Sequence, residues 1–496
     1  MKSKQQETPP KPKGSPPLEY CIVLYVNPGS FVSARSVRYD KSMHTNICII
    51  IASTILAFCG PTRAAEVPDL GTRKAGTDWP AFLGPTADGK SSETGLNLNW
   101  KARPPKLLWQ RPLTESYGMP SISRGRLVLY DRVKDKARVV CLNSETGREL
   151  WAVEHPTDYA DTIGYDNGPR CAPTIDDERV YTFSAEGLLM CLSIVDGKIL
   201  WKLDTTKEYA VRQNFFGVGS CPVVFGELLL VHIGGSPADS RPSSPDRLDE
   251  VKGNGTCVVA FDKRTGKEQY RTGNDLASYA TPVLSMINGR RWAFIFAREG
   301  LFAFDPTNGK REFEFPFRAK ELYSVNASNP VVVNDEVLIS ECYGPGSAML
   351  KVKPGGYNVV WQDDPGLRAK KALQTHWNTP IHHEGYVYGS SGRNSNNAEL
   401  RCVEWKTGKV VWSQPNLSRC SLTYLDGHFI CLGEYGETQV IRATPQKFES
   451  VATLAQVDPT TGERLIDYPA WAAPVISHGF LYLRGKSRFL CYDLSK

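Results

Sequence analysis

The sequence predicts an all-β protein, a single eight-bladed β-propeller built of four-stranded blades. Three observations support this prediction. A short phrase recurs along most of the chain, a distinct strand start precedes each copy, and the last repeat lacks a strand that an earlier segment can supply. Fixed periods of roughly 50 residues are typical of propellers and solenoids. Four short strands per unit, without helical periodicity between them, favour the propeller.

The recurring phrase runs from a small or apolar residue, through a turn that contains Gly, to a large aromatic residue. Degenerate copies lie at 350–361 and 441–451, and a truncated copy ends the chain at 491–496. We expect a strand, a tight turn with Gly at positive φ, and a second strand that opens with the aromatic side chain. The clear copies are 141–151, 191–201, 260–270, 303–313 and 402–412.

The strand starts precede these phrases and set the number of blades. Each consists of a small or polar residue and a Pro that lead into a hydrophobic strand, and one copy without Pro begins at Ser421. Together they make eight units. The Pro residues are Pro120, Pro173, Pro222, Pro282, Pro330, Pro380 and Pro474.

The two ends of the repeat region complement each other. The last unit stops at 491–496 without a fourth strand, whereas 107–110, which includes Trp109, is a Trp-led strand with no unit before it. We therefore expect the N-terminal strand to complete the last blade and close the ring, which leaves no exposed edge at the junction.

The domain boundaries follow from this arrangement. Residues 1–65 form a leader, 66–106 an N-terminal arm, and 107–496 the propeller. Within the leader, 47–58 is an uncharged apolar run of the length of a signal-peptide h-region, and it is too short to span a bilayer. Translation from Met1 and translation from Met43 both remain open.

The leader predicts export, to the periplasm or cell envelope or to the outside. Ala64 and Ala65 follow the apolar run and allow cleavage before Glu66. A lipid anchor at Cys59 is disfavoured, because Phe58 stands where a lipobox requires a small residue. We expect no transmembrane span in the mature chain.

Composition excludes several classes of protein. The 496 residues are 41% hydrophobic and 23% charged, which excludes wholesale disorder and a polytopic membrane protein. The net charge of +6 lies mostly in the leader, so the propeller offers no general basic surface for nucleic acid. We expect no nucleic-acid partner, and a monomer.

The cysteines follow the repeat and predict packing rather than chemistry. Cys141, Cys191, Cys402 and Cys491 share one repeat position, where other copies carry Ala, so a small buried side chain is expected there. The ten cysteines after residue 65 include no CxxC motif and no adjacent pair, and they therefore indicate neither a zinc site nor a redox site.

The phrase with Asp, Thr-Gly-Lys and Trp, together with the Pro-led strand starts, resembles the pyrroloquinoline quinone (PQQ) repeat. That repeat occurs in quinoprotein dehydrogenases and in BamB-like assembly lipoproteins. The resemblance covers essentially all of 107–496. The arm segments 78–85 and 88–96 resemble the opening of exported PQQ-like propellers of planctomycete type. The resemblance implies an eight-bladed propeller. It does not imply PQQ binding, because the repeat describes blade-locking residues rather than cofactor ligands.

Loops that gather on one axial face carry the candidate ligand-binding residues. Loops before the innermost strands, and loops between second and third strands, meet around the axis of a propeller. Their Trp, Arg, Asn and His side chains suit a polar, aromatic-walled pocket for an anionic or sugar-like ligand, or else they are ordinary residues of a channel mouth. The candidates are Asn167, Arg170, Arg212, Asn214, Tyr279, Asn326, His376, Trp377, Asn378, Arg419 and Trp471, and Tyr117 lies in a loop of the same kind.

The sequence indicates no catalytic or metal-ligating residue. A PQQ dehydrogenase needs a divalent ion with oxygen ligands and a carboxylate base. Only Asp166, Glu341 and Glu434 lie where they could reach the axis. His382 and His383 point to opposite sides of one strand, so they cannot hold one ion together. We expect no cofactor, with PQQ and calcium as the alternative.

Two functional hypotheses follow. The favoured one is an exported, non-catalytic scaffold that binds a protein, peptide or glycan at its axial face, with the loop 234–255 as a second contact region. The alternative is a PQQ-dependent quinoprotein oxidoreductase acting on alcohols or sugars. Whether the protein is an enzyme stays open, and the sequence leans against it.

Overall fold

The computed structural model describes residues 66–496, except 213–214, 245–246, 322–324, 365 and 459–460, and the backbone of two strands in the leader. These are β1 (Cys21–Tyr25) and β2 (Ser33–Val37), which pair antiparallel. The chain divides into two compact units, Met1–Glu66 and Val67–Lys496. The predicted h-region 47–58, the alternative start at Met43, and Cys59, where a lipid anchor is disfavoured, lie outside the described residues.

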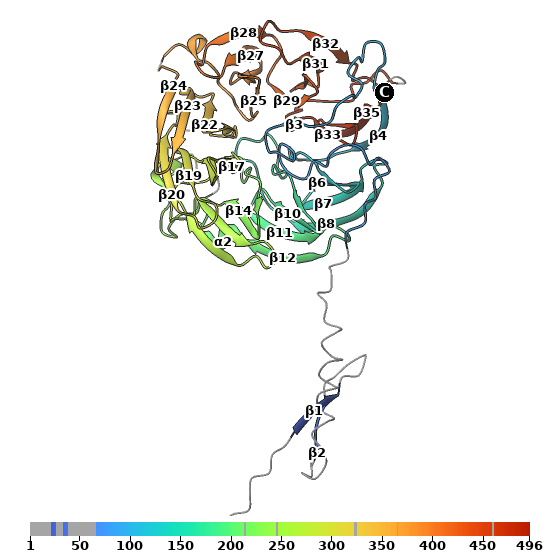
Figure 1. Ribbon diagram of the computed structural model, residues 1–496, viewed down its shortest axis with the longest axis vertical. Coiled ribbons are helices and arrows are strands. Elements are labelled where there is room, and N and C mark those ends of the chain that lie inside the picture. The colour runs from blue at the N-terminus through green and yellow to red at the C-terminus, as the bar shows by residue number, and fades with distance from the viewer. Residues whose placement is uncertain are drawn as a thin grey trace, which may run out of the picture. The chain divides into compact units, whose positions relative to one another are not determined.

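The second unit is the predicted eight-bladed propeller, and its blades follow the ring in chain order (Figure 1). Every blade is an antiparallel meander whose innermost strand follows one of the predicted strand starts. Blade 1 is β5 (Ser121–Ser123), β6 (Arg126–Val133), β7 (Lys136–Asn143) and β8 (Glu149–Pro156); blade 2 is β9 (Thr174–Asp176), β10 (Arg179–Phe183), β11 (Leu188–Ser193) and β12 (Ile199–Asp204). Blade 3 is β13 (Val223–Phe225), β14 (Leu228–His232), β15 (Val258–Asp262) and β16 (Glu268–Thr272); blade 4 is β17 (Val283–Ile287), β18 (Arg290–Phe296), β19 (Gly300–Phe304) and β20 (Arg311–Pro316).

The second half of the ring repeats the pattern and then closes it. Blade 5 is β21 (Val331–Val333), β22 (Glu336–Glu341), β23 (Gly346–Lys353) and β24 (Gly356–Gln362); blade 6 is β25 (Ile381–His383), β26 (Tyr386–Ser391), β27 (Glu399–Glu404) and β28 (Val410–Pro415). Blade 7 is β29 (Cys420–Leu425), β30 (His428–Gly433), β31 (Thr438–Arg442) and β32 (Ser450–Leu454); blade 8 is β33 (Val475–Ser477), β34 (Phe480–Arg484), β35 (Arg488–Asp493) and β4 (Lys106–Pro112). The short helices described are α2 (Thr205–Tyr209), η1 (Leu248–Glu250), η2 (Arg368–Lys370) and η3 (Ser395–Asn397).

Ring closure follows the predicted route. Strand β4 pairs antiparallel with β35, and Trp109 lies opposite Cys491 in that pair. The N-terminal strand is therefore the outermost strand of blade 8, as the truncated last repeat predicts. Among the described helices, none is both long and apolar enough to cross a membrane.

The recurring phrase locks neighbouring blades together at five junctions of the ring. Trp151, on the outer strand of blade 1, lies against Gly197 of blade 2, where an added Cβ would come within 2.6 Å of the indole ring. Gly197 has a φ of 76°, and the Trp151 indole N–H donates to the Ile194 carbonyl at 2.9 Å. Only glycine combines this backbone conformation with room for the ring. The same contact joins Trp109 to Gly147, Trp201 to Gly266, Tyr270 to Gly309 and Trp361 to Gly408.

The cysteine positions have the packing role that the repeat predicts. Cys141 pairs across the strands with Trp151, and Cys402 pairs with Trp412, with a shift of register directly after each pair. A small side chain at this position packs beneath the large indole of the neighbouring strand. All ten cysteines in the described region are buried and free of disulfides.

The arm crosses the face of the ring opposite to the strand starts. Trp79 bridges Ile122 of β5, and β3 (Lys90–Ser91) pairs in parallel with β29 of blade 7. Between these two anchors the chain reaches the ring axis. Trp79 itself is buried, with 1% of its surface exposed, and it ties the arm to the core.

Candidate functional site

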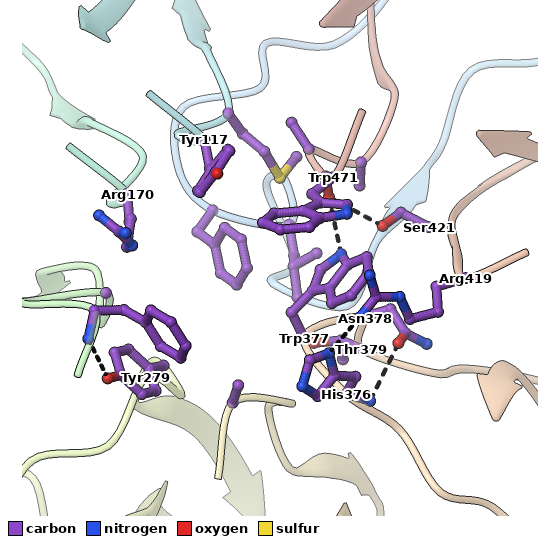
Figure 2. A pocket seen from close by; sticks show the side chains of 18 of the residues that line it. Tyr117, Arg170, Tyr279, His376, Trp377, Asn378, Thr379, Arg419, Ser421 and Trp471 are labelled. Carbon is purple, nitrogen blue, oxygen red and sulfur yellow. Dashed lines mark hydrogen bonds between the residues drawn. The ribbon is translucent and has the colours of Figure 1, made fainter. Parts of the chain in front are cut away.

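A cavity lies at the ring axis, on the face where the chain enters the innermost strands. Its volume is about 1180 Å³, counting the solvent at its mouth. The lining is mostly aromatic and apolar, as Figure 2 shows for its principal side chains. The lining residues are Phe82, Leu83, Tyr117, Met119, Tyr165, Arg170, Phe216, Gly219, Tyr279, Val325, Ala327, His376, Trp377, Asn378, Thr379, Arg419, Ser421, Leu422, Trp471, Ala472 and Ala473.

The arm supplies part of this lining from the opposite face of the ring. Phe82 and Leu83 lie between the anchors at Trp79 and β3, and both contribute to the cavity wall. The arm thus enters the axial channel from one face, and the cavity opens toward the other. We refer to this cavity as the axial pocket and to Phe82 and Leu83 as its floor.

Two tryptophans form one wall of the axial pocket. The centroids of the Trp377 and Trp471 rings are 5.0 Å apart, and the Trp377 indole N–H donates to the Trp471 carbonyl at 3.1 Å. The Ser421 hydroxyl donates to the same carbonyl at 3.2 Å. Tyr117 packs on Trp471 with a centroid separation of 4.6 Å. These bonds fix the orientation of the rings before any ligand arrives, which lowers the entropic cost of binding.

The facing wall consists of Tyr165, Phe216 and Tyr279. Phe216 lies 6.0 Å from Tyr165 and 5.6 Å from Tyr279, measured between ring centroids. The Phe216 backbone N–H donates to the Tyr279 hydroxyl at 2.9 Å. Tyr165 also reaches Trp471 across the mouth, at 5.8 Å, so the two walls form one continuous aromatic surface.

Arg419 is the cation of the tryptophan wall, and its guanidinium nitrogens all take part in hydrogen bonds. Its guanidinium binds the Glu434 carboxylate through Nε and Nη2, the shortest contact being 2.6 Å, and Nη1 donates to the Arg393 carbonyl. The guanidinium carbon lies 4.5 Å from the Trp377 ring centroid. Burial acts to raise the pKa of Glu434, but the hydrogen bonds from Arg419 outweigh this effect and the pKa is lowered. The pair is therefore ionised and contributes no net charge.

Arg170 repeats this arrangement on the facing wall. Its Nη2 binds the Asp161 carboxylate at 2.5 Å, and the Asp161 side chain has no exposed surface. Two further bonds go to the carbonyls of Asp166 and Gly168, and the guanidinium lies 5.4 Å from the Tyr117 ring centroid. Both arginines of the pocket are thus neutralised by buried carboxylates.

His376 is neutral at the edge of the tryptophan wall. Burial, together with the nearby Arg419 and Arg393, lowers the pKa of His376 to about 3. Arg419 Nη1 lies 3.3 Å from Nδ1, and the Tyr343 hydroxyl lies 2.9 Å from Nε2. A guanidinium can only donate, so Nδ1 accepts and the proton sits on Nε2. Since Nε2–H donates to the Tyr343 oxygen, both ring nitrogens are used.

Seven of the predicted site residues line the axial pocket, and others lie elsewhere. Asn167 and Asn326 stabilise loops, Asn167 through Glu115 and Asn326 through the Ala297 carbonyl. Arg212 donates to the carbonyls of Ser240 and Ala238 in the long insertion. Asn214 lies outside the described residues. The seven that line the pocket are Arg170, Tyr279, His376, Trp377, Asn378, Arg419 and Trp471.

Sequence reasoning missed the floor and two of the three residues of the facing wall. Phe82 and Leu83 belong to the arm, which the repeat does not cover, and Tyr165 and Phe216 stand in loops without a repeat signature. The available signal was the group of Trp79, Phe82 and Leu83 within 79–85, because exposed linkers seldom carry three large apolar side chains.

The predicted second contact region, 234–255, is tethered at both ends. Gly235 bridges Val211, and Asn254 donates to the carbonyls of Tyr209 and Ser236. The insertion therefore emerges from a fixed base beside α2.

The described residues offer no cluster of carboxylates for the calcium ion that accompanies PQQ. Calcium takes six or more oxygen ligands. Within the described part of the chain, no three His, Cys, Asp or Glu side chains converge where they could hold a metal. The carboxylates of Asp161 and Glu434 are each bound by an arginine. Glu341 lies outside the pocket lining, and burial raises its pKa to about 8.

Comparison with known families agrees with the repeat analysis. A family model described as outer membrane protein assembly factor BamB matches residues 100–244 and 135–414. The chain belongs to this family of PQQ-like propellers. A search of curated proteins gave no match.

Solved structures share the BamB-like fold at low sequence identity. BamB from Moraxella catarrhalis is 11% identical, with a TM-score of 0.51, and the match covers 78% of this chain and 97% of that one. Quinohemoprotein alcohol dehydrogenase from Comamonas testosteroni is 12% identical, with a TM-score of 0.56, and the match covers 84% and 81%. At this identity the similarity establishes the fold alone.

Proposed function

We propose that the protein is an exported, non-catalytic binding module and that the axial pocket is its binding site. One observation carries this proposal: the pocket is aromatic and closed by a floor, and its charged side chains are already paired. Preoriented rings around a concave, largely apolar site are typical of ligand recognition.

The composition of the lining favours binding over catalysis. The described residues that line the pocket include no Asp, Glu, Lys or Cys. His376 is neutral and has both ring nitrogens engaged. A general base needs a free acceptor at the reacting centre, and a nucleophile needs such a base beside it. None of the described lining side chains meets this requirement.

Location and partners form part of the same proposal. The apolar run 47–58 supports export. One of the similar solved structures is BamB from Moraxella catarrhalis, and the matching family is described as outer membrane protein assembly factor BamB. We infer an envelope location and a partner at the pocket face, with 234–255 as a second contact region.

A cavity-filling variant tests the proposal. Ala327 lines the pocket, so Ala327→Trp should fill it, while Val195→Trp places the same side chain on an exposed turn outside it. Binding of panels of oligosaccharides and peptides is followed by isothermal titration calorimetry. We expect ligands of the wild type to bind Val195→Trp equally and to lose at least tenfold in affinity for Ala327→Trp.

A second experiment addresses the oxidoreductase alternative. The wild-type protein is incubated with PQQ and Ca²⁺, and dye reduction is measured with a panel of alcohols and sugars. We expect no turnover. Turnover that exceeds the protein-free control, or equal binding by Ala327→Trp and the wild type, overturns the proposal.

A further inference from the structure

An exposed aromatic rim continues the wall of the axial pocket onto the surface. Tyr165, Tyr435 and Tyr468 are 51%, 41% and 42% exposed. Tyr435 stacks on Tyr468 with centroids 5.0 Å apart and an interplanar angle of 25°. Large exposed rings that cluster at the mouth of a pocket mark an interaction surface.

The rim and the pocket form one path of aromatic rings. Tyr468 lies 6.1 Å from Trp471, and Trp471 lies 5.0 Å from Trp377 and 5.8 Å from Tyr165. The path leads from the exposed Tyr435 inward to the walls above the floor. A ligand that uses all of it must be a chain of several units, each able to lie on an aromatic face.

The charge of the pocket excludes strongly charged ligands. Each guanidinium is held by a buried carboxylate, so an anion finds no unpaired cation among the described lining residues. A cationic group is also disfavoured, because Arg419 and Arg170 lie 4.5 and 5.4 Å from the rings of Trp377 and Tyr117. These guanidiniums already use the π faces that would attract a cation.

The closed floor decides between a glycan and a peptide. A ligand chain that follows the rim into the pocket meets Phe82 and Leu83, so one end of the ligand lies inside the pocket. A peptide end carries an ammonium or a carboxylate, and burying that charge without a free counter-charge is costly. A neutral sugar ring carries no charge to bury, and its apolar C–H faces can lie against the aromatic side chains.

We propose that the axial pocket and its tyrosine rim bind the terminal rings of a neutral polysaccharide chain. This inference rests on the proposed binding function and specifies its ligand class. The terminal ring occupies the pocket between the tryptophan wall and the facing wall, and the following rings lie over Trp471, Tyr468 and Tyr435.

Isothermal titration of the full-length protein with neutral oligosaccharides of one to six rings tests this. The panel includes gluco-, manno-, xylo- and N-acetylglucosamine series, with oligogalacturonate as the anionic counterpart. For at least one neutral series we expect affinity to rise with length until the rim is covered. The anionic series should bind at least tenfold more weakly.

Variants separate the rim from the pocket. Tyr435→Ala combined with Tyr468→Ala should lower the affinity for long chains by about tenfold and leave disaccharide binding unchanged, since only the long chains reach these two rings. Ala327→Trp should abolish binding at every length. Val195→Ala, a change at an exposed surface site, should bind like the wild type.

A terminally blocked, proline-rich peptide tests the alternative ligand class, because it has no charged end to bury. If such peptides bind, Ala327→Trp prevents it and no neutral glycan binds, then the glycan inference is overturned while the binding function stands. Absence of glycan binding, or affinity independent of chain length, also overturns the inference. Quinone-dependent turnover overturns the binding function itself.

Discussion

At the scale of single residues, the contact between Trp and Gly explains why the repeat is so strictly kept. Gly408 has a φ of 73°, and an added Cβ would come within 2.8 Å of the Trp361 ring. Gly385, in the same blade, has a φ of 82° and no atom within 4 Å of the added Cβ. The two glycines share the backbone requirement and differ in the indole contact.

This difference gives a matched pair of substitutions. Gly385→Ala should lower the free energy of unfolding by about 1 kcal/mol, through backbone strain alone. Gly408→Ala should cost about 2–4 kcal/mol, because the methyl group also displaces the blade-locking Trp361. Urea unfolding of both variants measures the difference. Equal losses in the two would show that the lock contributes little.

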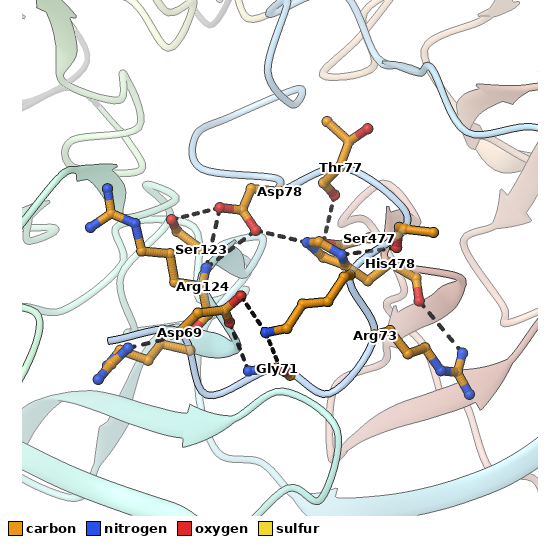
Figure 3. Close-up of polar contacts among 12 residues, drawn as sticks. Asp69, Gly71, Arg73, Thr77, Asp78, Ser123, Arg124, Ser477 and His478 are labelled. Atoms are coloured by element: carbon orange, nitrogen blue, oxygen red, sulfur yellow. Dashed lines mark hydrogen bonds and ion pairs between the residues drawn. The ribbon is translucent and has the colours of Figure 1, made fainter. Parts of the chain in front are cut away.

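At the scale of elements, the arm is held to blade 8 by an ion pair shown in Figure 3. His478 Nε2 lies 2.9 Å from an Asp78 oxygen, and Nδ1 lies 3.1 Å from the Ala75 carbonyl. Both partners are acceptors, so the imidazole is held in its protonated form. The Asp78 hydrogen bond raises the pKa of His478, and its neighbour Glu93 acts in the same direction.

The pair predicts pH-dependent docking of the arm. A raised folded-state pKa means that the stabilisation is complete below the ordinary His pKa of about 6.5 and is lost as the pH rises through the raised value. Protection factors for amide exchange in the arm should therefore be constant below about pH 6.5 and fall as the pH rises above it. Asn tolerates the φ of 52° at this position, so His478→Asn should flatten the profile.

A matched control lies in the equivalent hairpin of blade 7. His428→Asn should keep the pH dependence of the arm, because its ring contacts the Asp426 carbonyl and no carboxylate of the arm. Protection that is unchanged with pH in the wild type would contradict the proposed role of His478.

At the scale of the whole molecule, the closing strand determines whether the ring survives. Trp109 on β4 and Trp412 on β28 are both half-buried, and each donates its indole N–H to a carbonyl of the next blade, Ser144 or Thr444. Strand β4 is separated from its blade by almost the entire chain, whereas β28 follows its own blade directly. Because β4 pairs with β35, Trp109 anchors a strand that joins the N-terminal and C-terminal segments of the ring, whereas Trp412 anchors a strand within its own blade.

Replacing each tryptophan should reveal this difference. Trp412→Ala should cost about 2 kcal/mol of unfolding free energy, through lost packing. Trp109→Ala should cost more, since release of β4 opens blade 8 and exposes the edge of β35 to other molecules. Thermal unfolding combined with light scattering should show early aggregation for Trp109→Ala alone. Identical aggregation of both variants would contradict a special role for ring closure.

Most of the fold could be predicted from the sequence because the repeat depends on local backbone geometry. The Pro-led starts correspond to innermost strands such as β9 and β25, and the aromatic positions correspond to outer strands such as β8. Turn conformation and strand alternation depend on near neighbours in the chain, so they can be inferred from spacing. Trp377, Trp471 and Arg419 were found by the same route, since they stand just before repeat-defined strands.

The chain by itself determined eight blades, their order and the strand that closes them. Only the tertiary structure decided the character of the pocket. Phe82 comes from an arm far away in sequence, and the partners of Arg170 and Arg419, Asp161 and Glu434, cancel the charge that the arginines alone suggest. Repeat geometry depends on neighbours in the chain, whereas the shape and charge of a cavity depend on side chains that folding brings together from distant segments.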